Sequence, residues 1–354
     1  MRVIRRISAV IIGFVLFLSG VLKLMDPVGA TLVMEEYFKF LHLGGLSALS
    51  GVAGVGMALL EALLGAALIT GVWRKIAGVA TGILLGIFTL LTVLLYIRNP
   101  KMDCGCFGEV IHLTHLQSLL KNVALMVLWA LAFLPLRKQE RTRKIKFVSF
   151  PIAAVSVCVF MIWSLMRIPL VDFTPFKPGA ELMLPEDIDD PTDDRTPTLS
   201  LSDASGEYVD ELLMSGDLMV VSVYDPELMK PHQWAEVARL SRDASETGYR
   251  PLVLAAATPA MMEELVPAGT DLSGITYFAD RKKLLTLNRS NGGATYLQDG
   301  LIVNKWGFRQ LPDRSKLEEF DSADVTESLL SENNGARVKF QAFLLYVFAV
   351  MLLL

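Results

Sequence analysis

The sequence predicts an α-helical membrane bundle joined to a separate, water-soluble α/β domain. Of the 354 residues, 53% are hydrophobic and 20% are charged, and the mean hydropathy is +0.46. A globular chain averages about 45–50% apolar and about 25% charged residues. The apolar excess gathers in stretches of the length that a helix needs to cross a membrane, about 20 residues. Disordered, fibrous and ordinary soluble proteins are therefore excluded.

Charge and cysteine content narrow the function classes further. The 33 basic and 37 acidic side chains give a net charge of −4, which has the wrong sign for a nucleic-acid partner. The chain has only 3 cysteines, too few for a disulfide scaffold, and all of them precede residue 160. Any thiol chemistry must therefore take place in the first half of the chain.

Five predicted spans lie in the first half. They cover residues 7–22, 46–72, 76–97, 116–136 and 147–166. The first extends to Met25 if Lys23 snorkels, the second contains the acid Glu61, and the fourth contains Lys121, which is expected to snorkel. A sixth candidate, residues 340–354, is short, so it is either a minimal span or a truncated one.

Basic residues set the predicted orientation, because they are retained on the cytoplasmic side. Three basic clusters fall on one side of the predicted spans: Arg2, Arg5 and Arg6; Arg74 and Lys75; and Arg137, Lys138, Arg141, Arg143, Lys144 and Lys146. The N-terminus is therefore expected in the cytoplasm. The loops 23–45 and 98–115, and everything from residue 167 to the sixth candidate span, are expected outside it.

The soluble domain follows a spacer. Residues 185–194 are rich in proline and acid and cannot pack a core. The patterns that follow predict a hairpin at 199–209, strands at 218–224, 251–257 and 275–278, helices at 232–246 and 260–265, and a last hairpin, 294–297 with 301–306, turning at Asp299 and Gly300. Alternating strands and helices with a terminal hairpin indicate an α/β sandwich.

The outward loop before the fourth span contains the motif Asp103-Cys-Gly-Cys-Phe-Gly-Glu109. Cys104 and Cys106 can close a small, strained disulfide, and strain makes a disulfide easier to reduce. Gly105 gives the backbone the freedom that such a ring needs. The pattern therefore favours a redox pair, with a permanent loop staple or two unreactive thiols as the alternatives.

Other polar residues leave alternatives open. Cys104, Cys106, His112 and His115 form a weaker candidate metal site, since structural zinc sites space their cysteines by two to four residues. Glu61, inside a span, is either a proton relay to a bound quinone or a buried carboxyl that fixes helix register. Cys158 lies in mid-span and is interpreted as a small hydrophobe.

The N-terminal features together resemble the DoxX/MauE-like family of four-span membrane proteins over about the first 135 residues. The resemblance rests on Gly13-Phe14, Phe17-Leu-Ser-Gly20, Lys23-Leu-Met-Asp-Pro27, Glu61, Gly65 and the Cys-Gly-Cys-Phe-Gly motif. It implies a link to methylamine utilisation, in which MauE is thought to help a periplasmic dehydrogenase subunit acquire disulfides. DoxX relatives add a link to quinone-dependent sulfur oxidation.

The soluble domain resembles thioredoxin-like domains across about residues 197–312. In that fold the strand-to-helix junction holds two cysteines, and here Met229 and His232 occupy their places. The cis-proline expected near residues 290–297 is also missing. His232 is therefore interpreted as a helix-start residue, and the domain as one that presents or docks a partner.

The predicted organisation is a four-helix domain at 1–136, a basic loop and fifth span at 137–169, a linker at 170–196, a thioredoxin-like domain at 197–320 and a last span at 338–354. We expect a multi-pass protein of the bacterial inner membrane, in contact with lipid and with a periplasmic client protein. The leading hypothesis is thiol-disulfide exchange at Cys104 and Cys106, coupled to quinone. The alternatives are a non-enzymatic assembly factor and metal handling.

Overall fold

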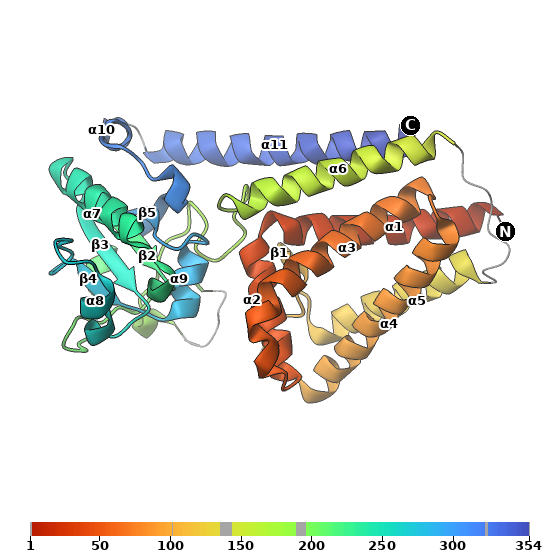
Figure 1. The fold of residues 1–354 in the computed structure, drawn as a ribbon, viewed down its shortest axis with the longest axis horizontal. Helices are drawn as coiled ribbons and strands as arrows, with labels where there is room; N and C mark the ends of the chain where they lie inside the picture. Colours follow the sequence, from red (N-terminus) through yellow and green to blue (C-terminus); the bar gives the residue numbers. More distant parts are fainter. Residues whose placement is uncertain (1, 101, 135–143, 189–195, 323–324, 354) are drawn as a thin grey trace. The chain divides into compact units, whose positions relative to one another are not determined.

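The computed structural model describes residues 2–100, 102–134, 144–188, 196–322 and 325–353. The chain divides into two compact units, Met1–Met166 with Lys339–Leu354, and Arg167–Val338 (Figure 1). The predicted basic residues Arg137, Lys138, Arg141 and Arg143, and linker residues 189–194, lie outside the described residues.

The first unit is built from helices, and the six predicted spans are confirmed as apolar helices. They are α1 (Arg2–Met25), α3 (Ser50–Thr70), α4 (Arg74–Arg98), α5 (His115–Phe133), α6 (Lys146–Leu165) and α11 (Val325–Leu353). In each helix a stretch of 19 residues or more is apolar enough to cross a membrane, and in α11 that stretch is Gly335–Leu353. The chain is therefore a multi-pass membrane protein by length and composition.

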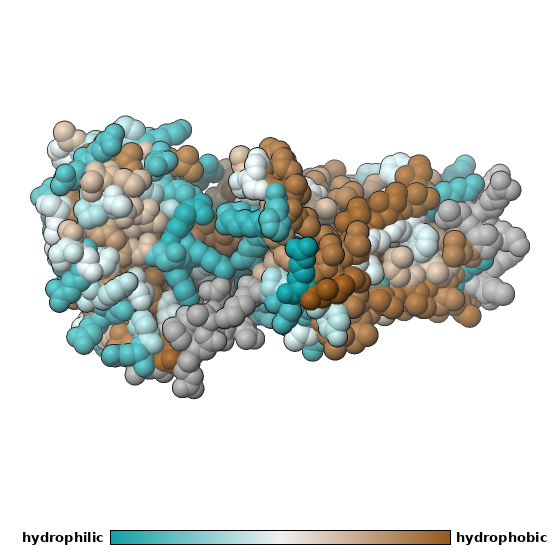
Figure 2. Space-filling view, turned by 90° about the horizontal axis from the view of Figure 1, so that it is seen from below, coloured by the Kyte–Doolittle hydropathy of each residue, from teal (hydrophilic) through white to brown (hydrophobic). Residues whose placement is uncertain are grey.

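Exposed apolar side chains on the helices agree with this interpretation. On α4 the side chains of Ile76, Ile83 and Leu90 recur every seven residues and are 61–70% exposed. Exposed aliphatic residues at two-turn spacing share one helix face. Figure 2 shows brown, hydrophobic atoms covering the helices of this unit. An exposed apolar surface of this extent suits hydrocarbon rather than water.

Helices α1 and α3 approach closely because glycines line their contact. A Cβ added at Gly20 would lie 2.4 Å from the backbone nitrogen of Ala62, and one at Gly65 would lie 2.4 Å from that of Phe17. Small residues let two membrane helices bring their backbones together. This contact sets the positions of Ser19 and Lys23 on α1 relative to Glu61 on α3.

The segment between the first two spans differs from the predicted loop. It contains α2 (Pro27–Phe40), which begins where the Asp26 carboxylate accepts a hydrogen bond from the Gly29 amide at 2.9 Å. Proline at the first helical position and an aspartate before it are a helix-start signal. The loop before the fourth span also has structure, a short strand β1 (Cys106–Glu109).

The second unit is an α/β domain around a five-stranded sheet of order β4-β3-β2-β5-β6. The strands are β2 (Asp217–Val223), β3 (Arg250–Ala255), β4 (Thr276–Phe278), β5 (Gly293–Gln298) and β6 (Leu301–Trp306). Strands β2, β3 and β4 are parallel, whereas β5 is antiparallel to β2 and β6 to β5. These strands and the helices α7 (Pro231–Glu246) and α8 (Pro259–Leu265) agree with the sequence prediction.

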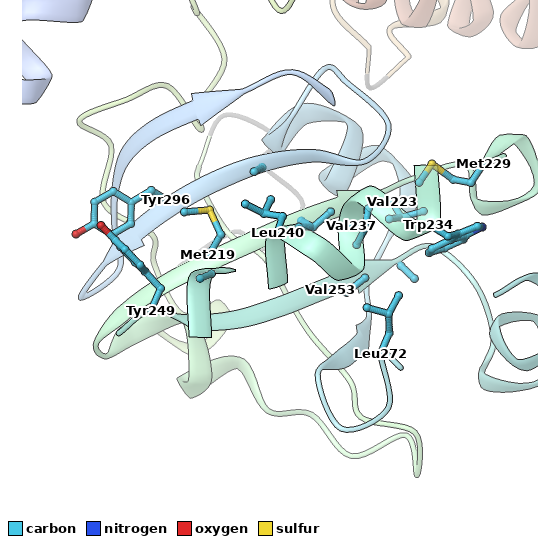
Figure 3. Packing of buried hydrophobic residues seen from close by; sticks show 14 of the residues in the cluster. Met219, Val223, Met229, Trp234, Val237, Leu240, Tyr249, Val253, Leu272 and Tyr296 are labelled. Atoms are coloured by element: carbon cyan, nitrogen blue, oxygen red, sulfur yellow. The ribbon is translucent and has the colours of Figure 1, made fainter. Parts of the chain in front are cut away.

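Each face of the sheet is covered by its own apolar cluster. Figure 3 shows α7 lying over one face, with Trp234, Val237 and Leu240 packed toward the strands and Tyr249 against Tyr296. On the other face Leu218 and Val220 pack with Leu284 and Leu287 of α9 (Arg281–Leu287). The alternation of strand side chains between faces produces the two clusters.

Three details of this unit differ from the prediction. The hairpin at 199–209 is reduced to a bridge between Ser202 and Tyr208. Helices α9 and α10 (Arg314–Ser322) were not predicted. Residues 170–184, predicted as linker, contribute Phe176 and Leu182 to the core. The backbone of this segment is bonded to the sheet end, where the amide of Leu182 donates to the carbonyl of Gly300 at 2.8 Å.

Candidate functional site

The predicted thiol pair lies together in the loop between α4 and α5. The Cys104 and Cys106 sulfurs are 3.0 Å apart, and both cysteines are free. Gly105 between them has a φ of +61°, the left-handed region that glycine adopts without strain. A Cβ at this position would also lie 2.3 Å from Cγ1 of Val33 on α2. Glycine is therefore required both by the turn and by the close approach of α2.

The two cysteines have different surroundings. Cys104 is 5% exposed, and the hydroxyl of Tyr37 on α2 donates to its carbonyl oxygen at 2.9 Å and lies 3.9 Å from its sulfur. The hydrogen bond to Cys106, together with burial, raises the pKa of Cys104. Cys104 is therefore the protonated member of the pair, and it donates its hydrogen to Cys106.

Cys106 is the member that ionises. The hydrogen bond from Cys104 lowers the pKa of Cys106 to about 5, aided by the positive charges of Lys121 and Lys23 and opposed by burial. A thiolate, not a thiol, is the nucleophile in disulfide exchange. At neutral pH this site therefore holds one nucleophilic sulfur beside one protonated sulfur.

Glu61 is fully buried in α3 and is connected to the thiol loop. Its carboxylate accepts from the Lys23 ammonium at 2.6 Å and lies 2.6 Å from the Ser19 hydroxyl. The same hydroxyl lies 2.6 Å from the carbonyl oxygen of Cys106. Because a hydroxyl carries one hydrogen, Ser19 donates to one of these two oxygens at a time. The Ser19 side chain thus links Glu61 to the thiol loop.

A cavity opens beside the thiol pair inside the helical unit. It encloses about 1100 Å³ including its mouth, and aliphatic and aromatic side chains from α1 to α5 form most of its wall. The polar groups in the wall are few: Ser19, Lys23, Tyr37, Glu61, Thr92, Cys104, Cys106, Lys121 and Asn122. An apolar cavity with a few convergent polar groups is typical of a ligand site.

Asn122 contributes to this wall a hydrogen-bond acceptor without a partner among the described residues. Its side-chain amide donates to Thr92 at 3.2 Å, and its Oδ1 atom is buried without a hydrogen-bond partner among the described residues. A buried polar atom without a partner costs free energy, so a ligand that donates a hydrogen bond is favoured there.

The two histidines of the predicted metal site each contact another group through one ring nitrogen. His112 lies 2.8 Å from the Asp103 carboxylate, and His115 lies 3.1 Å from the carbonyl oxygen of Pro100. Within the described ranges, no three His, Cys, Asp or Glu side chains gather as a metal site requires. Cys158 is partly exposed on α6.

In the α/β unit the structure places Met229 and His232 at the start of α7. His232 is exposed in the first turn, and Met229 is buried against Gly292, whose added Cβ would lie 3.1 Å from the methionine Cε. The loop near residue 292 thus faces the strand-to-helix junction. All three cysteines of the chain lie outside this unit.

Sequence reasoning missed Lys121, Lys23 and Tyr37 as members of the site. Both lysines were expected to snorkel toward water, and Tyr37 was placed in the outward loop 23–45. A base within an apolar span was a usable signal, because such a charge needs a partner or a pathway.

Comparison with protein families matches residues 1–135 to the family of methylamine utilisation protein MauE. The matched residues cover α1 to α5 and the thiol loop. Comparisons with curated proteins and with solved structures give no match.

Proposed function

We propose that this chain is a membrane thiol-disulfide oxidoreductase whose Cys104 and Cys106 pair exchanges with thiols of an extracytoplasmic client and passes the electrons to a quinone. The observation that supports this most directly is the pair of sulfurs, 3.0 Å apart, in the wall of an apolar cavity within the helical unit. A cavity of this kind gives a lipid-soluble oxidant a place beside the thiols.

The proposed electron transfer from the client to the quinone has two steps. In the first, two client thiols reduce the Cys104–Cys106 disulfide, so that a disulfide forms in the client and the pair takes up two electrons and two protons. In the second, the pair is oxidised to its disulfide, and a quinone takes up the same two electrons and two protons to become a quinol. The unused Asn122 oxygen suits the quinol, because a quinol hydroxyl donates a hydrogen bond and a quinone carbonyl does not.

The α/β unit is proposed to hold the client. Its unit β2-α7-β3, followed by the antiparallel pair β5-β6 and α10, supports a thioredoxin-like fold. In such a fold the Met229 junction and the facing loop at Gly292, which contact each other, would correspond to the active-site positions. Without cysteines, this surface binds rather than exchanges.

The match to the MauE family supports an accessory role in methylamine utilisation. The client is then a periplasmic protein of that process that acquires disulfides. This role requires the inner membrane, with the thiol loop and the α/β unit on the periplasmic side.

The test is thiol trapping in whole cells, with the reduced and oxidised forms of Cys104 and Cys106 resolved by mass after alkylation. We expect the pair to be largely oxidised in normal cells and to become reduced when quinone synthesis is blocked. Cys158→Ser is the matched control, and it should leave both results unchanged.

The variant Cys104→Ser with Cys106→Ser should leave client thiols reduced. If the client stays fully oxidised in this strain, the proposal is wrong. A loss of function on deletion of residues 197–312, with the double variant still active, would instead support a non-enzymatic assembly factor.

A further inference from the structure

Two lysines line the cavity beside the thiol loop, and they differ in their partners. Lys23 is paired with the Glu61 carboxylate at 2.6 Å. Lys121 has no carboxylate within ion-pair distance among the residues that the structure describes, and its ammonium lies 5.0 Å from the centre of the Phe107 ring. A cation in an apolar span is costly unless a negative charge offsets it.

The group beside Lys121 that can carry a negative charge is the side chain of Cys106. The Lys121 ammonium, which lies over the Phe107 ring, also makes a hydrogen bond with the side chain of Cys106, and both residues line the same cavity. Cys104, by contrast, is held at its carbonyl by Tyr37 and is 5% exposed. Among the described residues, Cys106 is therefore the sulfur with a cation beside it that has no carboxylate partner.

From this geometry we propose that Lys121 is the positioning residue that stabilises the Cys106 thiolate, and that Cys106 is the sulfur that attacks the oxidant in the cavity. The assignment deepens the proposed function and rests on it for the identity of the oxidant as a quinone. The lowered pKa of Cys106 and the raised pKa of Cys104 agree with the same division between the two residues.

The Cys106 thiolate forms a bond to an electrophilic ring carbon of the quinone, and Cys104 then attacks the Cys106 sulfur. The disulfide forms as the carbon–sulfur bond breaks, and the electron pair passes to the ring. The ring takes one proton from Cys104 and one from solvent, because Cys106 has already ionised.

The charged and titratable groups around Cys106 come from each helix that packs on the loop. They are Lys23 on α1, Tyr37 on α2, Glu61 on α3 and Lys121 on α5, together with Cys104 in the loop itself. Because the Glu61 carboxylate offsets the charge of Lys23, Lys121 is the lysine that contributes more positive charge at the Cys106 sulfur. A neutral residue at position 121 therefore removes most of this charge.

The test measures the pH dependence of iodoacetamide alkylation at Cys106 in the reduced, full-length protein in detergent, in a Cys158→Ser background. We expect a rate that is constant above about pH 6 and falls at about pH 5, where Cys106 is protonated. Lys121→Met should move this midpoint upward by about one unit, which slows the reaction about tenfold below the new midpoint. The rate at pH 9 should stay unchanged.

Lys121→Arg should restore the midpoint of the parent protein, because it restores the charge. Lys39→Met is the matched control, since Lys39 is exposed and paired with Glu35 outside the cavity. Lys121→Gln provides a second neutral variant if Lys121→Met does not fold. The proposal is overturned if neutral variants keep the midpoint at about 5, or if Cys104 is alkylated before Cys106 at pH 6.

This measurement needs neither client nor quinone. An unchanged alkylation midpoint in the neutral variants would therefore contradict the role of Lys121, even if thiol trapping in cells supports thiol exchange. Conversely, a normal alkylation profile with a pair that does not respond to quinone depletion would contradict the proposed function alone.

Discussion

Gly105 is the residue on which the approach of the two thiols depends. Gly105→Ala places a side chain in a left-handed conformation, at a cost of about 1–2 kcal/mol, and directs its Cβ to 2.3 Å from Val33. We expect the loop to shift away from α2 and the pair to form its disulfide more slowly. The rate of disulfide formation after addition of diamide measures this.

Gly108→Ala is the matched control for this prediction. Gly108 lies in the same loop with the same φ of +61°, but the nearest atom to an added Cβ is 3.8 Å away. It therefore shares the backbone cost without the clash. Equal slowing in both variants would show that backbone strain alone, and not contact with α2, controls the pair.

The buried pair of Glu61 and Lys23 makes a second prediction. Removing one partner of a buried ion pair destabilises a protein by about 3–5 kcal/mol, because the other charge stays behind. Glu61→Ala should therefore destabilise strongly, and Glu61→Ala with Lys23→Met should recover much of the loss. The melting temperature in detergent measures both, and a double variant no more stable than Glu61→Ala would contradict the pairing.

At this scale the sequence singled out Cys104, Cys106 and Glu61 as candidates because their chemistry is visible in the residue type and its setting, and the structure places all three in the wall of one cavity. It did not identify Lys121 or Tyr37 as partners. Their role depends on which way α5 and α2 are rotated, and an apolar span with a single base does not fix that rotation. Gly105 was predicted correctly because a two-residue separation leaves few turns available.

At the scale of elements, the close contact between α1 and α3 determines the geometry of the site. Gly20→Ala would place its Cβ 2.4 Å from the Ala62 backbone, so the two helices must separate. Overpacking of this kind costs about 1–3 kcal/mol. We expect a lower melting temperature and a changed alkylation profile at Cys106, because Ser19 and Glu61 sit on the separated helices.

Gly56→Ala on the same helix α3 is the control, since no atom lies within 4 Å of its added Cβ. It should be neutral or slightly stabilising, because alanine favours a helix over glycine. Equal losses in both variants would mean that glycine flexibility, and not close packing, is what the helices need.

The spans were predictable as elements, whereas α2 was not. Length and hydropathy alone predict a span, and the six apolar helices agree. Helix α2 is a 14-residue segment between two spans, and the sequence signal for its start is Asp26 followed by Pro27. Helix α9 was likewise hidden, because seven residues are too few for a helical period to stand out.

At the scale of the whole molecule, the average composition concealed two populations. The hydrophobic excess belongs to the helical unit, and the α/β unit presents the mixed polar surface seen in teal and white in Figure 2. The change in composition near residue 167 was readable in the sequence. The cavity was not, because its wall draws on five helices far apart along the chain.

The positions of basic residues predict how the chain crosses the membrane. Arg74 and Lys75 are the first two residues of α4, directly after the turn that follows α3. Basic residues at such a turn are retained in the cytoplasm. Five apolar helices precede the α/β unit, so an N-terminus in the cytoplasm places this unit on the opposite side. The thiol loop, between α4 and α5, then faces the same side as the α/β unit.

Labelling with a membrane-impermeant maleimide tests this in intact cells, in a background where the three cysteines are replaced by serine. Ser205→Cys, in an exposed turn of the α/β unit, should label without permeabilisation. Lys75→Cys, also exposed, should label only after permeabilisation. The reverse pattern would place the thiol pair in the reducing cytoplasm, where a disulfide donor has no oxidising surroundings to support it, and the proposed exchange with extracytoplasmic clients would be wrong.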